Sequence, residues 1–280
     1  MKISGLTIVC NAVKYDYPVV EAIRAILPVC DEFIVGIGES TDGTRDLIRS
    51  INSPKIKIFE AKWDFSKGPQ VLSEQTNLAL AKCTGDWVFY VQADELIHED
   101  DLPRLKKIME DDLNDKDVDA LRFKYLHFYG NYYRYRIDAG WFQKQDRIIR
   151  NNGTIESYGD AYAFRRKDGN PLKTRSTGCL LYHYGWVHSG EVVTQRRANH
   201  KKMGFEGLEN LNESKAHDFG ELDRFPVYFG SHPLVMKERI GQHALSQADK
   251  IHIDRKYWWF PPKIMKLRYK TSRRVKQRMS

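Results

Sequence analysis

Acidic residues directly follow an apolar run near the middle of the chain. Residues 87–91 read WVFYV, and Gln92, Ala93, Asp94 and Glu95 come next. A carboxylate at the end of a buried strand is costly to desolvate unless it is paired or bound to a metal. Carboxylates and diphosphate oxygens together commonly hold a hard divalent ion. The pattern favours a divalent-metal site, and a solvated loop carboxylate is the simpler alternative.

A second polar segment covers residues 38–44 and reads GESTDGT. Ser-Thr-Asp-Gly-Thr is a good turn and helix start, and Asp42 can cap the helix. The unpaired amides and the dipole of a helix N-terminus also favour phosphate. The segment is therefore either a simple turn or part of a phosphate-binding edge.

The elements that must position these residues alternate along the first 115 residues. Alternating strands and helices predict a mostly parallel sheet with covered faces, in which ligands bind beyond the carboxyl ends of the strands. We therefore expect the polar residues that follow the strands to lie at one edge. The patterns predict strands at 6–10, 33–37, 56–59 and 87–91, and helices at 18–27, 42–51, 69–83 and 102–113.

The composition changes from residue 120, where aromatic residues and arginines become frequent. Short runs bounded by turn residues are typical of antiparallel strands. They predict strands within 121–135, 141–150, 155–166 and 180–184, followed by helices at 192–202 and 235–249.

The order of these features resembles the nucleotide-binding half of family 2 glycosyltransferases. The resemblance is carried by Asn11 after the first strand, the 38–44 segment, a Lys-Gly loop at Lys67, a helix with Asn77, and the Gln92–Glu95 sequence. It covers residues 5–100 well and 141–186 more loosely. It implies the GT-A fold, a doubly wound, mixed α/β sheet with a helical C-terminal extension.

The resemblance also implies a division of the chain and a reaction. Residues 1–115 would bind the nucleotide sugar, residues 116–200 would form the acceptor and catalytic half, and residues 201–280 would form the extension. The reaction would be transfer of a sugar, with inversion, from a nucleotide-diphosphate donor to a glycan or lipid-linked glycan. A UDP-sugar is the expected donor.

Donor and metal roles follow from the matching positions. Asp94 would bind Mn²⁺ or Mg²⁺ that bridges the diphosphate, and His183 would complete the metal site, because late-strand histidines do so in many GT-A enzymes and imidazole suits Mn²⁺. Gln92 stands where the family has a first aspartate, and it is a poorer ligand for a hard metal. The expected donor-binding residues are Asn11, Glu39, Asp42, Lys67, Gln75, Asn77, Gln92 and Asp94.

The acceptor half should supply a general base, because an inverting transfer needs a carboxylate to take the proton of the acceptor hydroxyl. The resemblance favours Asp160 as the catalytic base, with Glu156 in reserve; a turn role beside Gly159 is the alternative for Asp160. Tyr184 and Trp186 could stack on a sugar ring or pack in the core. His188 is a second candidate ligand, and the remaining histidines that we weighed are expected to be structural: His127, His232 and His243.

The charge is concentrated at the C-terminus. The net charge is +8, and residues 256–280 contain nine Lys/Arg and no Asp/Glu, so the other residues carry 36 basic against 37 acidic side chains. Aromatic residues beside this basic stretch suit an anionic membrane surface, although a solvated tail is the simpler reading. With no nucleic-acid-binding module, nucleic acid is not an expected partner. Scattered cysteines and no recognisable signal peptide lead us to expect a cytoplasmic protein, and the basic stretch adds the expectation of peripheral contact with the inner face of the membrane.

Two other functions stay open at this stage. A nucleotidyltransferase has a related α/β layout but would need a Gly-rich basic loop after the first strand, where this chain has Cys10-Asn11-Ala12-Val13-Lys14. A catalytically inactive protein that binds a nucleotide sugar or a glycan is the second, and Gln92 is the residue that favours it.

Overall fold

The fold is built on one large mixed sheet. The computed structural model describes residues 1–138 and 140–242. The sheet has nine strands in the order β3-β2-β1-β4-β8-β6-β11-β5, with β7 paired to β6 outside this path, and β9 and β10 form a separate two-stranded sheet. The strands are β1 (Ile3–Val9), β2 (Glu32–Ile37), β3 (Ile56–Glu60), β4 (Trp87–Tyr90), β5 (Glu95–Ile97), β6 (Ala120–Tyr129), β7 (Asn131–Arg136), β8 (Lys144–Arg150), β9 (Ile155–Tyr158), β10 (Ala163–Arg166) and β11 (Thr174–Trp186).

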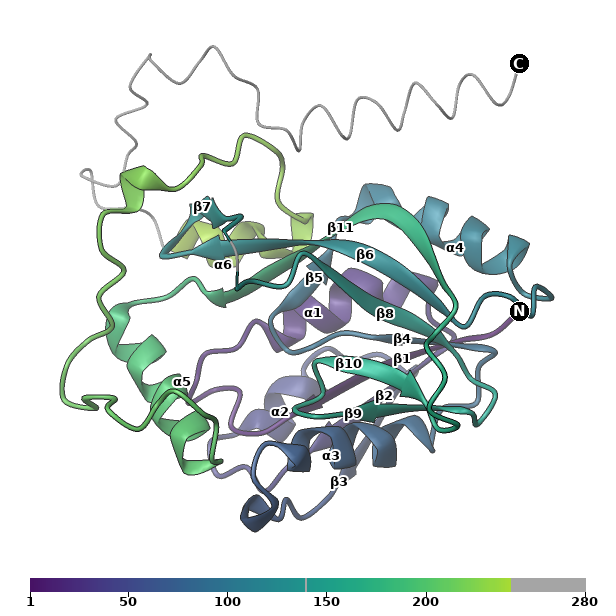
Figure 1. Ribbon diagram of the computed structural model, residues 1–280, viewed down its shortest axis with the longest axis horizontal. Helices are drawn as coiled ribbons and strands as arrows, with labels where there is room; N and C mark the ends of the chain where they lie inside the picture. Colours follow the sequence, from purple (N-terminus) through teal and green to yellow (C-terminus); the bar gives the residue numbers. More distant parts are fainter. Residues whose placement is uncertain (139, 243–280) are drawn as a thin grey trace.

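Helices cover both faces of the sheet (Figure 1). They are α1 (Val19–Ile26), α2 (Thr44–Arg49), α3 (Gln70–Leu80), α4 (Leu102–Asp111), α5 (Gly190–Lys202) and α6 (Lys237–Gln242), with short 3₁₀ turns between them. Successive residues of β4 point to opposite faces. Trp87 and Phe89 pack in the same cluster as residues of α1 and α4, whereas Val88 and Tyr90 pack in the cluster that contains residues of α3. This arrangement confirms the predicted doubly wound α/β fold.

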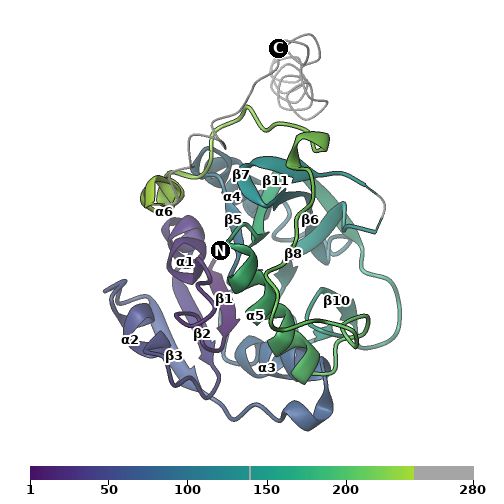
Figure 2. The same ribbon diagram turned by 90° about the vertical axis from the view of Figure 1, so that its left-hand side faces the viewer.

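Strand direction divides the sheet into two parts. Strands β3, β2, β1 and β4 are parallel, β8 runs antiparallel between β4 and β6, and β11 is parallel to β6. The parallel part formed by β3, β2, β1 and β4 therefore meets the later strands where β4 pairs with β8. Figure 2 shows α5 crossing in front of the sheet, and residues of α5 line a cavity with the end of β1.

Strand β5 is the element that the sequence patterns missed. It pairs antiparallel with β11, and its register sets Glu95 opposite His183. On the other side of β11, His183 is in register with His127 of β6. This three-strand register brings residues from three distant parts of the sequence onto one site.

Several predicted boundaries change. The run 121–135 is a hairpin that turns at Gly130, where φ is +73°, and 155–166 is the β9–β10 hairpin. Strand β11 is much longer than the predicted 180–184, because it pairs with two neighbours. The predicted helix 235–249 is described only to residue 242, where it consists of a 3₁₀ turn and α6. Its remainder and the basic stretch 256–280 lie outside the described residues.

The predicted boundaries at residues 115 and 200 stay a prediction. Strands from both sides of residue 115 join in one sheet. Among the helices of the described residues, none is long and apolar enough to cross a membrane.

A buried carboxylate ties the amino ends of the parallel strands together. Glu32, at the start of β2, is 3% exposed and accepts hydrogen bonds from Ser4 of β1 and from the backbone and side chain of Thr84 before β4. Lys57 of β3 lies 2.7 Å from its other oxygen. Burial alone raises the pKa of Glu32, but these partners outweigh burial and lower the pKa to about 2.

We expect Glu32→Gln to lower the free energy of unfolding at pH 7 by roughly 3 kcal/mol. Because the folded pKa is below the unfolded value of 4.5, this contribution is complete above pH 4.5 and is lost as the pH falls toward 2. Urea unfolding of wild type and variant at pH 7, 5, 4 and 3 measures the difference. A difference that does not shrink below pH 4.5 would contradict this role for the charge.

Candidate functional site

One cavity of about 350 Å³ lies at the carboxyl ends of β1 and β4 and is covered by α5. Its wall brings together six of the residues predicted from the sequence: Asn11, Glu39, Gln92, Asp94, Asp160 and His183. These residues come from four separate loops and one strand, and in the sequence they span residues 11 to 183. Their convergence makes this cavity the candidate active site.

Asp94 and His183 face each other across Gly185. Asp94 Oδ2 lies 3.6 Å from His183 Nε2, and both side chains are largely buried. A Cβ atom at residue 185 would lie 2.6 Å from each of these two atoms. The missing side chain therefore leaves open the space that both groups point into. The backbone carbonyl of Asp94 accepts the N–H of Tyr184, which holds this apposition in place.

The pair fits a divalent ion. Bonds of about 2.0–2.1 Å to each ligand would allow one ion to reach two atoms 3.6 Å apart. Burial raises the pKa of Asp94, but His183 and Arg196 outweigh burial and hold it below its usual range, so the carboxylate is charged at neutral pH. A charged oxygen and an imidazole nitrogen are a donor set suited to Mn²⁺.

A second histidine, His127, which the sequence left as structural, contacts the first. His127 Nδ1 lies 3.0 Å from His183 Nδ1, and His127 Nε2 lies 2.7 Å from the carbonyl oxygen of Phe142. Burial, reinforced by His183, lowers the pKa of His127 to about 3, so this imidazole is neutral. The register of β6 with β11, which sets His127 beside His183, could not be read from the local patterns of either strand.

A buried ion pair fixes the loop that carries Asp94. Glu95, which is fully buried, accepts two hydrogen bonds from Arg147, of 2.7 and 2.8 Å, and one of 3.1 Å from the backbone N–H of Gln92. The hydroxyl of Tyr125 donates to the same carboxylate. Arg147 lies at an irregularity in the pairing of β8 with β6, where a bulge re-aims a side chain. The acidic motif thus contributes one carboxylate to the cavity and one to the core.

Gln92, where the chain departs from the family pattern, makes a hydrogen bond to the loop that carries Asp160. Its side-chain amide donates to the carbonyl of Ala161 at 3.3 Å, next to Asp160. Arg147 donates to the neighbouring carbonyl of Tyr162 at 3.0 Å. Ala161 has a positive φ of 61°, a conformation that costs energy for a non-glycine residue and persists only where the surroundings impose it. Gln92 therefore connects the Asp94 loop to the loop of the candidate base.

The two loops on the donor side are joined by polar contacts. Asn11, with φ of 53°, accepts the N–H of Thr41 on its side chain and donates its own N–H to Ser40. Asp42 accepts the N–H of Lys14 and the N–H and hydroxyl of Thr44, but the N-cap residue of α2 is Gly43, so the predicted helix cap at Asp42 is wrong. Asn11 and Glu39 reach the cavity, whereas Asp42 holds the loops that carry them.

Four other predicted residues have partners away from the cavity wall. Lys67 pairs with Glu74 at 2.9 Å. The amide of Gln75 donates to the carbonyl of Lys62, Asn77 makes two hydrogen bonds with the backbone of Ser157, and Glu156 pairs with Arg165. These contacts give Lys67, Gln75, Asn77 and Glu156 structural roles, and their donor or catalytic roles stay predictions.

Helix α5 supplies the residues that sequence reasoning missed. Arg196 is 4% exposed and donates to the carbonyls of Tyr15, Asp16 and Gly185, so it ties α5 to the loop after β1. The neighbouring residues Arg197, Asn199 and His200 also line the cavity. In the sequence, two adjacent arginines in the predicted helix 192–202 were the only indication that this helix contributes to a site. The fold shows that the helix covers the cavity.

Of the remaining candidates Trp186, Tyr184 and His188, Trp186 lines the cavity and the other two have partners within the protein. Trp186 lines the cavity and is partly exposed. Tyr184 does not stack on a ligand, because it is 2% exposed and its ring stacks on Phe128 at 4.9 Å. His188 pairs with Asp16 in the loop after β1.

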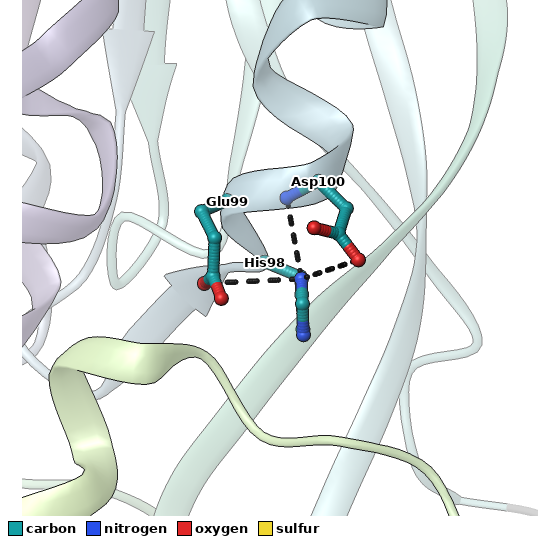
Figure 3. Close-up of side chains that lie close together, drawn as sticks. All are labelled: His98, Glu99 and Asp100. Carbon is teal, nitrogen blue, oxygen red and sulfur yellow. Dashed lines mark hydrogen bonds and ion pairs between the residues drawn. The ribbon is translucent and has the colours of Figure 1, made fainter.

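A second group of possible ligands lies elsewhere (Figure 3). His98, Glu99 and Asp100 place ligand atoms within 4.8 Å of one another. His98 Nδ1 accepts the N–H of Asp100, His98 Nε2 lies 2.9 Å from Ser231 Oγ, and Glu99 accepts the N–H of Leu234. These atoms already cap a 3₁₀ turn and hold the 231–234 segment, whereas Asp94 and His183 both face the open space beside Gly185.

Comparison with known families places the chain among enzymes. Residues 6–186 match the model of glycosyl transferase family 2, and the chain belongs to this family. It is therefore a glycosyltransferase with the GT-A fold. A search of curated proteins finds no match.

Solved structures of glycosyltransferases show distant similarity. Residues 1–349 of S. aureus TarS share 17% identity, with a TM-score of 0.43, over 76% of this chain and 68% of that chain. Glucosyl-3-phosphoglycerate synthase from Mycobacterium tuberculosis, solved with Mn²⁺ and UDP, shares 20% identity, with a TM-score of 0.34, over 44% of this chain and 43% of that chain.

We expect Glu95→Gln to lower the free energy of unfolding by about 3–5 kcal/mol, because it leaves the buried Arg147 without its counter-charge. Glu95→Gln combined with Arg147→Met should recover part of this loss. Glu156→Gln is the matched control, since its pair with Arg165 is exposed and worth about 0–1 kcal/mol. Denaturant unfolding at pH 7 measures the free energy of unfolding of all three variants. A loss of stability in Glu95→Gln as small as that in Glu156→Gln would contradict a stabilising role for the buried ion pair of Glu95 and Arg147.

Proposed function

We propose that this glycosyltransferase transfers a sugar, with inversion, from a metal-bound nucleoside diphosphate to a glycan or lipid-linked glycan hydroxyl. The observation that carries the proposal is the convergence of Asp94, His183 and Asp160 on one cavity that Asn11 and Glu39 also line. Together these residues provide the groups that such a transfer needs: metal ligands, a base and a polar edge for the nucleoside.

The donor would lie along the carboxyl edge of the sheet. Asn11 and Glu39, at the ends of β1 and β2, would contact the nucleoside, and Asp94 with His183 would hold Mn²⁺ or Mg²⁺ beside the diphosphate. Arg197 of α5 adds a cationic side chain to the same wall. A UDP-sugar is the donor to test first.

The reaction needs one proton transfer and one displacement. Asp160 would take the proton of the acceptor hydroxyl as its oxygen attacks the anomeric carbon, and the nucleoside diphosphate would leave from the opposite face. A bound divalent ion would stabilise the negative charge on this leaving group. Gln92 and Arg147 would hold the Asp160 loop in place, and α5 would limit access of water to the site.

Two features of the chain would bear on binding of the acceptor. Trp186, at the cavity wall, offers a ring on which an acceptor sugar could stack. Contact of the basic stretch 256–280 with an anionic membrane would bring the enzyme to a lipid-linked acceptor.

We expect Asp94→Asn to weaken binding of UDP in the presence of Mn²⁺ by at least tenfold, because it removes a charged ligand from the metal site. Calorimetric titration of UDP, GDP, CDP and dTDP with Mn²⁺, Mg²⁺ or EDTA measures the affinity. Asp46→Asn, at a highly exposed position on α2, is the control and should bind as wild type does. Wild-type binding that is unchanged by EDTA would remove the metal from the proposal, and binding of none of the four would end it.

We expect Asp160→Asn to bind the donor as wild type does but to lower kcat by about 10²–10⁴-fold, since general-base catalysis contributes this much. Release of nucleoside diphosphate from a panel of nucleotide sugars and glycan acceptors measures turnover. Glu156→Gln should retain activity. The opposite pattern would assign the base to Glu156, and a wild-type protein that binds donor but never turns it over would favour the binding-protein alternative.

A further inference from the structure

We infer that His127 is a positioning residue that fixes the tautomer of His183 and turns its Nε2 lone pair toward Asp94. The inference deepens the proposed function and rests on it, because His183 is there assigned as a metal ligand. His127 does not line the cavity itself and contacts His183, which does.

The sheet places the two histidines side by side. His127 of β6 and His183 of β11 are paired in register in the parallel part of the sheet, so their side chains lie on the same face. Their rings are 4.9 Å apart at an angle of 78°, and the two Nδ1 atoms are 3.0 Å apart. This distance and near-perpendicular arrangement suit an N–H of one ring donating to the lone pair of the other.

The direction of that hydrogen bond follows from a carbonyl. His127 Nε2 lies 2.7 Å from the carbonyl oxygen of Phe142, which can only accept, so Nε2 of His127 carries the proton. In a neutral imidazole the other nitrogen then has a lone pair. Nδ1 of His127 therefore accepts, and Nδ1 of His183 donates.

The proton on Nδ1 of His183 determines the state of its other ring nitrogen, Nε2. A metal ion binds only the neutral imidazole, and in neutral His183 a proton on Nδ1 leaves the lone pair on Nε2, the atom that lies 3.6 Å from Asp94 Oδ2. In that form the Nε2 lone pair and the Asp94 carboxylate face the same space, and both are ligand atoms for a cation placed there. The hydrogen-bond chain thus prepares the pair to receive a positive charge in the space beside Gly185.

The surroundings keep His127 in this role. It is 4% exposed, and the rings of Tyr125 and Trp141 pack against it at 4.3 and 5.0 Å. A buried imidazole in such an environment is held neutral by the cost of desolvating its charged form. The packing also fixes the ring plane, so that both nitrogens stay directed at their partners. Partners of this kind, behind a metal ligand, typically change metal affinity by about 10–100-fold when removed.

The first test reads the proton positions directly. The full chain, labelled with ¹⁵N-histidine and freed of metal, is measured by long-range ¹H–¹⁵N correlation, with His183→Gln and His127→Asn used to assign the signals. We expect a proton on Nδ1 of His183 and none on Nδ1 of His127. The reverse arrangement would overturn the inference.

The second test reads metal affinity. Free Mn²⁺ is counted by electron paramagnetic resonance as Mn²⁺ alone is titrated into wild type and variants. His127→Phe keeps an aromatic ring but no acceptor and should weaken Mn²⁺ binding by about 10–100-fold. His127→Asn, whose amide oxygen can take the place of Nδ1, should keep most of the affinity.

His232→Phe is the matched control, because His232 is another partly buried histidine packed among aromatic rings that does not line the cavity. It should leave Mn²⁺ affinity unchanged, and thermal melting of every variant checks that the chain is folded. Wild-type affinity in His127→Phe would overturn the inference. If the wild-type chain bound no Mn²⁺, the proposed metal role of His183 would fail, whereas the proton positions would still decide whether His127 orients it.

Discussion

The candidate site depends on the buried ion pair between Glu95 and Arg147. Two charges out of water are tolerable only where each is fully hydrogen-bonded, and here the carboxylate also binds the backbone of Gln92 and the hydroxyl of Tyr125. Arg147 in turn binds the carbonyl of Tyr162. The pair therefore holds the loop before β5 and the loop between β9 and β10 to the same point of the sheet. Asp94 and Asp160 lie one on each of these loops, which the hydrogen bond from Gln92 to Ala161 also joins.

The mixed direction of the sheet allows its two parts to contribute to one site. The parallel strands bring their polar carboxyl ends to the nucleotide edge, and β5, β11 and β6 present Glu95, His183 and His127 in neighbouring register. Helix α5 closes the space between the parts through Arg196, which binds backbone carbonyls on both sides. Charged groups in a site that excludes water interact more strongly than in solvent, and closure by α5 would favour the proposed stabilisation of a diphosphate leaving group.

The sequence predicted the parts of the fold that depend on local patterns. Apolar runs and helix signals located the four parallel strands and the helices between them, and the residues after those strands included Asn11, Glu39, Gln92 and Asp94 at the cavity. Long-range pairing was beyond these patterns. Strand β5 has only three residues, so its register with β11 could not be seen, and the separate register of β6 with β11, which pairs His183 with His127, is likewise set by long-range pairing. Lys67 and Asn77 were chosen by position along the chain, and the structure gives them partners away from the cavity.

We propose that Asp94 and His183 share one divalent ion. Anomalous scattering from crystals grown with Mn²⁺ and a nucleoside diphosphate tests it most directly, because the signal locates the ion without reference to activity. The account predicts a peak between Asp94 Oδ2 and His183 Nε2, beside Gly185. A peak at His98, Glu99 and Asp100 with none beside Gly185, or no peak at either place although the nucleotide is bound, would contradict it.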